Sequence, residues 1–160
     1  MKAKSLRPLE VLLVEDNPGD VRLTQEALEQ TRRPHRLNVV EDGVAALEFL
    51  RKEGAFRGMP SPDIILLDLN LPRRDGRDVL QEMRRDRLLA KIPVVVLTVS
   101  HSDRDMVECG KLKVNFINKP VMRDELAHVM ETPSDFFATA VKPASRRGKK
   151  RGAAGRKRSP

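Results

Sequence analysis

The sequence contains no tryptophan, no tyrosine and a single cysteine, and it lacks any run of about 18 apolar residues. The lone Cys109 excludes an intrachain disulfide, so a hydrophobic core must stabilise the fold. The missing apolar run excludes a transmembrane helix, and no apolar segment stands at the N-terminus. We therefore expect a water-soluble protein of the cytoplasm. At 160 residues the chain has room for one domain with a sizeable core.

Acidic residues are missing from residues 142–160, which contain nine of the 31 lysines and arginines. The other 141 residues hold 22 basic and 23 acidic groups, so the formal charge of +8 comes from this tail. We expect a lead-in over 1–8, a domain over 9–141 and a disordered basic tail over 142–160. Because the tail has no aromatic residues for base stacking, any nucleic-acid binding by it would be directed at the phosphate backbone.

Five short apolar runs predict strands that are buried on both faces, as in a parallel sheet. They cover residues 11–14, 37–40, 64–67, 92–97 and 114–117. Helical periodicity follows each run, and the fourth and fifth helices are expected over about 103–112 and 123–130. Because crossovers between parallel strands are right-handed, helices should cover both faces of the sheet. The expected fold class is α/β, a three-layer sandwich.

The first helix has a clear start signal at Asn17 and Pro18. Asn17 is a suitable N-cap, and proline is favoured at the first helical position. The apolar positions of this helix are Val21, Leu23, Ala27 and Leu28.

Polar side chains follow four of the five predicted strands. They are Glu15 and Asp16 after the first strand, Asp68 after the third, Thr98 after the fourth and Lys119 after the fifth. Alone, Asp68 is as well explained as a turn cap, and Lys119 as a surface charge. Because the carboxyl ends of parallel strands meet at one edge of the sheet, their joint occurrence favours a functional site.

Three carboxylates at one edge repel one another, by about 4 kcal/mol for a pair ~4 Å apart. We therefore expect a bound cation, and Mg²⁺ suits oxygen ligands of this kind. The expected ligands are Glu15, Asp16, Asp68 and the backbone carbonyl of Asn70. Lys119 adds a second positive charge and Thr98 a hydroxyl donor. Such a set suits a phosphoryl acceptor, with Asp68 as the nucleophile.

Four segments carry a resemblance to a known family: VLLVEDNPGD, DIILLDLNLPRRDG, VVVLTVS and FINKPV. In order and spacing they resemble the response-regulator receiver domains of two-component signalling. The resemblance implies a flavodoxin-like sheet in the order 2-1-3-4-5 with five helices. It also implies Mg²⁺-dependent transfer of a phosphoryl group from a sensor histidine kinase to Asp68, followed by slow self-catalysed dephosphorylation. The protein would then be a signalling protein rather than an enzyme.

The family resemblance also implies a conformational switch and a cis peptide bond. Thr98 would move toward the phosphoryl group while Phe116 turns inward, and the bond between Lys119 and Pro120 would be cis. Phe116 lacks the hydroxyl of the tyrosine often found there. Val99 replaces a smaller residue and would narrow access to the site.

Three segments resemble stand-alone regulators that are partnered with bacterial phytochrome-type histidine kinases: DLNLPRRDGRDVL, the loop EGAFRGMPSPD and the late segment FFATAV. Such a regulator would act through changed protein contacts, and its fourth helix, fifth strand and fifth helix would form a homodimer face. Two other functions remain open. An aspartyl-phosphate hydrolase usually has a second aspartate where Asn70 stands. A nucleic-acid-binding protein would use the basic tail over 142–160.

Overall fold

The structure is a computed structural model of the chain, and it describes residues 7–99 and 114–131. Its strands are β1 Leu9–Val14, β2 His35–Val40, β3 Ile64–Asp68, β4 Val94–Thr98 and β5 Val114–Asn118. They form one sheet in the order β2-β1-β3-β4-β5, and every neighbouring pair is parallel. The flavodoxin-like order expected from the sequence is confirmed. β4 begins at Val94, two residues later than predicted, directly after Pro93.

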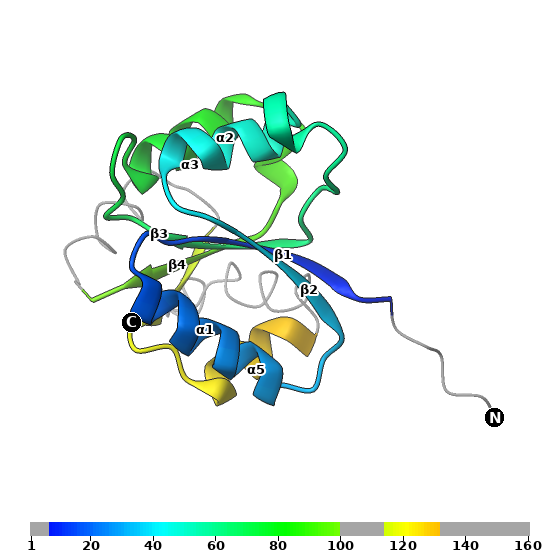
Figure 1. Ribbon diagram of the computed structural model, residues 1–160, viewed down its shortest axis with the longest axis vertical. Helices are drawn as coiled ribbons and strands as arrows, with labels where there is room; N and C mark the ends of the chain where they lie inside the picture. Colours follow the sequence, from blue (N-terminus) through cyan, green and yellow to red (C-terminus); the bar gives the residue numbers. More distant parts are fainter. Residues whose placement is uncertain (1–6, 100–113, 132–160) are drawn as a thin grey trace, which may run out of the picture.

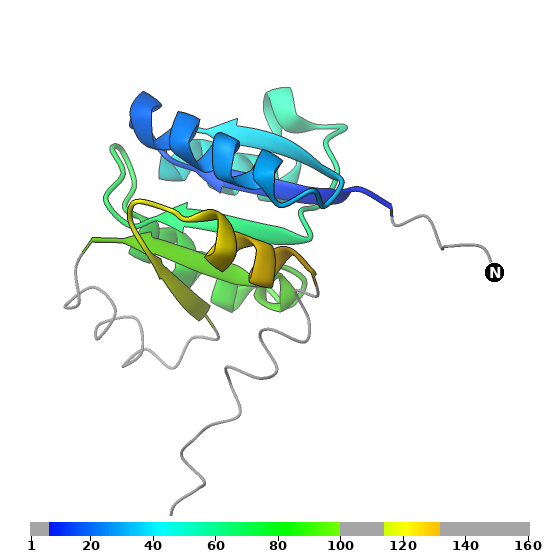
Figure 2. The same cartoon turned by 90° about the horizontal axis from the view of Figure 1, so that it is seen from below.

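Helices cover both faces of this sheet (Figure 1). The helices are α1 Pro18–Gln30, α2 Gly43–Arg51, α3 Gly76–Arg85 and α5 Arg123–Glu131, with short 3-10 turns at Gly54–Phe56 and Leu89–Lys91. α2 and α3 lie on one face, and α1 and α5 lie side by side on the other (Figure 2). The predicted helix over 103–112 and the basic tail lie outside the described residues.

The core consists of two hydrophobic clusters, one on each face of the sheet. Because side chains alternate along a strand, Leu12 and Val14 of β1 pack toward α2 and α3, whereas Val11 and Leu13 pack toward α1 and α5. All four side chains are buried. Burying one such side chain contributes about 1.5–3 kcal/mol. The central strands are thus packed on both faces.

Helix α1 begins as the sequence predicts, but one of its apolar residues faces outward. Asn17 is the N-cap and Pro18 the first helical residue, as predicted. Leu23, one of the apolar positions of this helix, is 47% exposed. The helix instead buries Thr24, whose hydroxyl donates a hydrogen bond to the carbonyl of Asp20 at 2.9 Å and is thereby satisfied.

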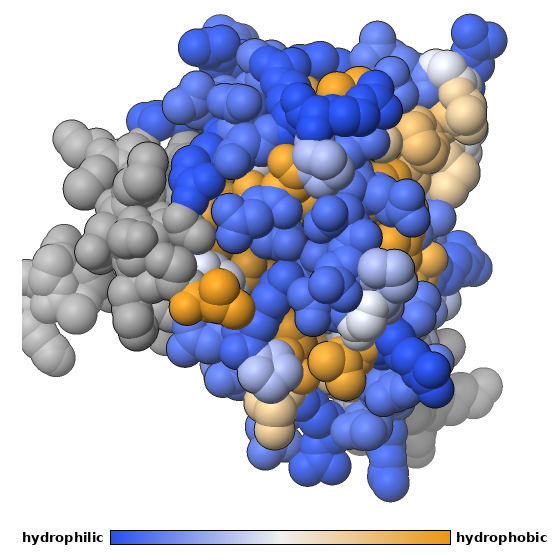
Figure 3. Space-filling model, turned by 60° about the vertical axis from the view of Figure 1, so that its left-hand side comes forward, coloured by the Kyte–Doolittle hydropathy of each residue, from blue (hydrophilic) through white to orange (hydrophobic). Residues whose placement is uncertain are grey.

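The surface on the left-hand side of Figure 1, which Figure 3 turns forward, is mostly hydrophilic with small separate apolar patches. Within residues 7–99 and 114–131, none of the helices combines the length and apolar character needed to cross a membrane.

Candidate functional site

The pairing register places the polar residues at the strand ends next to one another. Val14 pairs with Leu67, so Glu15 follows at the level of Asp68. On the other side, Asp68 pairs with Leu97 and Thr98 pairs with Asn118, which precedes Lys119. The predicted meeting of these side chains at one edge of the sheet is therefore a consequence of the register.

Lys119 is the centre of the site. Its ammonium donates to Glu15 Oε1 at 2.6 Å, to Asp20 Oδ2 at 3.0 Å and to Asp68 Oδ2 at 3.2 Å. Burial opposes its charge, but the hydrogen bonds to Glu15 and Asp20 and the charge of Asp68 outweigh that effect and raise the pKa of Lys119. The peptide bond from Lys119 to Pro120 is cis, as the resemblance implied.

Glu15 is 0% exposed, the most deeply buried charged residue of the site. Its Oε2 accepts a hydrogen bond from the backbone N–H of Asn17 at 3.3 Å. The pKa of Glu15 is raised to about 7, because burial and the neighbouring Asp68 raise it by more than the contact with Lys119 lowers it. A carboxylate with this environment gains stability from any additional positive charge.

Asp68 is buried at the end of β3 and is held from two sides. Its Oδ1 accepts from the backbone N–H of Asn70 at 3.0 Å, and its Oδ2 accepts from Lys119. The following loop returns closely onto the strand end, because the Gly76 N–H donates to the carbonyl of Leu69 at 2.9 Å. A Cβ on Gly76 would stand 2.5 Å from the Asp68 carbonyl oxygen, so only glycine fits this approach.

Three carboxylates of the site are close enough to share one cation. Glu15, Asp16 and Asp68 each offer an oxygen, and these oxygens lie within 4.8 Å of one another. Asp16 is exposed, so a cation bound here would keep coordination positions open to water or to a ligand. With one ammonium against this cluster the net charge is negative, and the donor set therefore fits a divalent cation. Coordination of the cation by the Asn70 carbonyl stays a prediction.

Thr98 and Phe116 lie where the sequence placed them. Thr98 is buried at the end of β4, and its carbonyl accepts from the Lys119 N–H at 3.0 Å. Phe116 pairs with Val96 and is half-buried, packed in part against the hydrophobic cluster beneath α2 and α3. Val99 is exposed beside the site. Their roles in a switch stay predictions.

Asp20 is the residue of this site that sequence reasoning missed. It lies in the first turn of α1, where acidic residues are common because they interact favourably with the helix dipole. An aspartate at this position therefore gives no sign in the sequence of its contact with Lys119. Only the fold brings residues 20 and 119 together. The available signal was its position four residues after Asp16, in the first turn of the helix that follows the acidic pair.

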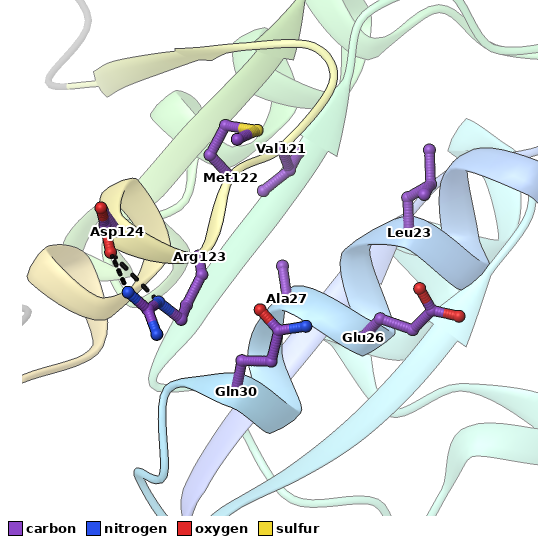
Figure 4. A pocket seen from close by; sticks show the side chains of 8 residues that line it. All are labelled: Leu23, Glu26, Ala27, Gln30, Val121, Met122, Arg123 and Asp124. Carbon is purple, nitrogen blue, oxygen red and sulfur yellow. Dashed lines mark hydrogen bonds and ion pairs between the residues drawn. The ribbon is translucent and has the colours of Figure 1, made fainter.

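A groove of about 350 Å³ adjoins the site between α1 and the start of α5 (Figure 4). Leu23 and Met122 line opposite sides of it, and they are 47% and 58% exposed. Glu26, Gln30, Arg123 and Asp124 add polar groups around these apolar side chains. The groove is thus a mixed surface that a protein partner can contact.

Fold and site together define a phosphoryl-accepting receiver of the α/β type. The model of the response regulator receiver domain matches residues 11–131, and the chain belongs to this family. It is a response regulator of two-component signalling.

Similar proteins narrow the comparison within this family. The chain is 41% identical to the response regulator Rcp1 of Synechocystis sp., over 91% of this chain and 100% of Rcp1. The structure of Mn²⁺-bound Rcp1 matches with a TM-score of 0.66, over 86% of this chain and 100% of that one. The phosphorylated cyanobacterial phytochrome response regulator RcpA matches with a TM-score of 0.68 and 40% identity, over 85% and 98%. The bacteriophytochrome response regulator RtBRR matches with a TM-score of 0.71 and 40% identity, over 76% and 75%.

Proposed function

We propose that Asp68 accepts a phosphoryl group from the phosphohistidine of a sensor histidine kinase. The observation that carries this proposal is the environment of its carboxylate, which lies 3.2 Å from the Lys119 ammonium and shares a cation-binding cluster with Glu15 and Asp16. Phosphoryl transfer depends mainly on positioning and on charge neutralisation, and this arrangement supplies both.

In the proposed reaction, a carboxylate oxygen of Asp68 forms a bond to phosphorus. The bond from phosphorus to the histidine nitrogen breaks, and its electron pair returns to the imidazole. Lys119 and the Thr98 hydroxyl contact the phosphoryl oxygens. Later, water cleaves the acyl phosphate and restores the carboxylate, so the protein dephosphorylates itself slowly instead of turning over an outside substrate.

We infer that the divalent cation is Mg²⁺. Glu15, Asp16, Asp68 and the Asn70 carbonyl would hold it, and when bound it neutralises charge on the phosphoryl oxygens. Carboxylate and carbonyl oxygens are the ligands that Mg²⁺ prefers. The Mn²⁺ of the Rcp1 structure supports a divalent ion of similar ligand preference.

We further propose a phytochrome-type histidine kinase as partner, in the cytoplasm. The similarity to RcpA and RtBRR, which are phytochrome response regulators, supports this partner. The kinase would contact the groove beside the site, because Leu23 and Met122 offer exposed apolar surface there. Phosphorylation would shift Thr98 and Phe116 and thereby change protein contacts, including those of a homodimer. Light scattering that gives one protomer in both phosphorylation states would argue against the dimer.

Intact-mass analysis after incubation with acetyl phosphate and Mg²⁺ tests the function. We expect one phosphoryl mass on the wild type and none on Asp68→Asn. Asp86→Asn, a change of the same type at the end of α3, is the matched control and should be phosphorylated like the wild type. Equal phosphorylation of Asp68→Asn would refute the assignment of the acceptor.

A further inference from the structure

We propose that Asp20 is a positioning residue of phosphoryl transfer, acting by holding the Lys119 ammonium in place when Asp68 is modified. This inference rests on the proposed function and extends it to a residue at the start of α1. The contact that carries it is the ion pair between Asp20 Oδ2 and Lys119 Nζ at 3.0 Å.

The ammonium of Lys119 has three N–H donors, and three carboxylates accept them. Glu15 and Asp68 are buried, whereas the Asp20 side chain is 35% exposed. Asp20 is therefore the acceptor on the solvent side. Its contact keeps the flexible Lys119 side chain from moving deeper into the site or out into the solvent.

Hydrogen bonds within the first turns of α1 hold the backbone of Asp20, and thereby its carboxylate, in position. Its N–H donates to the side chain of the cap residue Asn17 at 3.1 Å, and its carbonyl accepts from the Thr24 hydroxyl at 2.9 Å. The N-terminal end of a helix also stabilises a negative charge. The position of the carboxylate thus follows from α1 and does not depend on Asp68.

Phosphorylation changes the third contact of Lys119 and leaves the other two. Once an oxygen of Asp68 is bonded to phosphorus, the carboxylate loses its full charge and a phosphoryl oxygen becomes the new acceptor. Glu15 and Asp20 then continue to hold the ammonium on two sides while its third N–H meets that oxygen. Without Asp20, the Lys119 ammonium would be less restrained before the reaction. Fixing its position during phosphoryl transfer would then cost entropy and slow the reaction.

The same ion pair lies close to the groove, because the two share neighbouring residues. A small hollow beneath it is lined by Asp20, Leu23, Thr24, Lys119, Pro120 and Val121. Leu23 and Val121 also line the groove of Figure 4. A partner in the groove would accordingly come close to Asp20.

The test measures the rate of phosphorylation by acetyl phosphate with Mg²⁺ in the full-length chain. We expect Asp20→Ala to be about tenfold slower than the wild type, as for the loss of one charge-assisted hydrogen bond. Asp20→Glu keeps the carboxylate and should recover most of the rate. Glu29→Ala, which removes an equal charge from the exposed side of α1, should react like the wild type.

Two comparisons separate positioning from a general structural or charge effect. In the Lys119→Met background, Asp20→Ala should cause no further slowing, because the partner is gone. In metal-free buffer, the two substitutions should be non-additive in the midpoint of urea unfolding. If loss of negative charge mattered more than positioning, Asp20→Ala would be faster than the wild type. A faster or an unchanged rate of Asp20→Ala would overturn the inference. So would additive unfolding midpoints, or equal slowing by Asp20→Ala in the Lys119→Met background.

The experiment distinguishes failure of the proposed function from failure of this inference. If the wild type takes up no phosphoryl group, both are wrong. If the wild type is phosphorylated on Asp68 and Asp20→Ala reacts equally fast, only the inference about Asp20 is wrong.

Discussion

Glu15 should make the stability of the metal-free protein fall as the pH rises toward neutrality. Burial raises the pKa of Glu15 from 4.5 to about 7 in the folded chain, so between these values the folded state binds more protons at this site than the unfolded state does. Stability therefore decreases with rising pH in this window, and the loss is complete above pH 7. One pKa unit corresponds to 1.36 kcal/mol, which gives a loss on the order of 3 kcal/mol.

Urea unfolding in buffer with a chelator, at pH 5 and pH 8, tests this prediction. Glu15→Gln keeps an oxygen that can accept from Lys119 but cannot titrate, so it should lack this part of the pH dependence. Other carboxylates titrate in both proteins and cancel in the comparison. Adding Mg²⁺ at pH 8 should restore stability to the wild type more than to Glu15→Gln, because a cation bound only by the folded chain stabilises it. Parallel pH profiles of the two proteins would refute the reasoning.

Three further predictions concern the loop, the groove and the start of the sheet. Gly76→Ala should destabilise the fold by about 1–3 kcal/mol and slow phosphorylation, since its Cβ would meet the β3 end, whereas Gly58→Ala, with open space around it, should be neutral in urea unfolding. Leu23→Asp should slow transfer from the kinase and leave acetyl phosphate as donor unaffected, while Leu88→Asp, exposed outside the groove, should change neither rate; equal slowing with both donors would contradict the placement of the kinase. Asp63→Ala should lower the unfolding free energy by about 1–3 kcal/mol. Hydrogen bonds from Arg7 lower the pKa of Asp63, so its contribution exists above the unfolded pKa and is lost as the pH falls through the folded pKa; a wild-type advantage that stays constant in acid would contradict this.

The sheet and most of the site follow from local patterns in the sequence. Buried strands appear as short apolar runs, and their parallel pairing makes the residues after Val14, Leu67 and Leu97 neighbours. The signals at Asn17 and Pro18 are equally local, since a cap needs only its own first turn. These features were predictable because nearby residues determine them.

Two features depend on packing and were not predictable in this way. Leu23 lies on the groove side of α1 because Thr24 occupies the buried position and satisfies its hydroxyl within the helix. The contact of Asp20 with Lys119 joins residues that are 99 positions apart, and no periodic pattern marks it. The sequence therefore identifies the cap at the start of α1, but the partner of the Asp20 side chain depends on the whole fold.

Chemical mapping of the modified residue tests the central claim most directly. An aspartyl phosphate is an acyl phosphate, so borohydride reduces it to homoserine, which can be located by peptide sequencing in the mass spectrometer. After reaction with a phosphorylated histidine kinase and Mg²⁺, we predict homoserine at position 68 and nowhere else. Homoserine at another aspartate, or phosphate that resists borohydride and remains on a histidine or serine, would contradict the account.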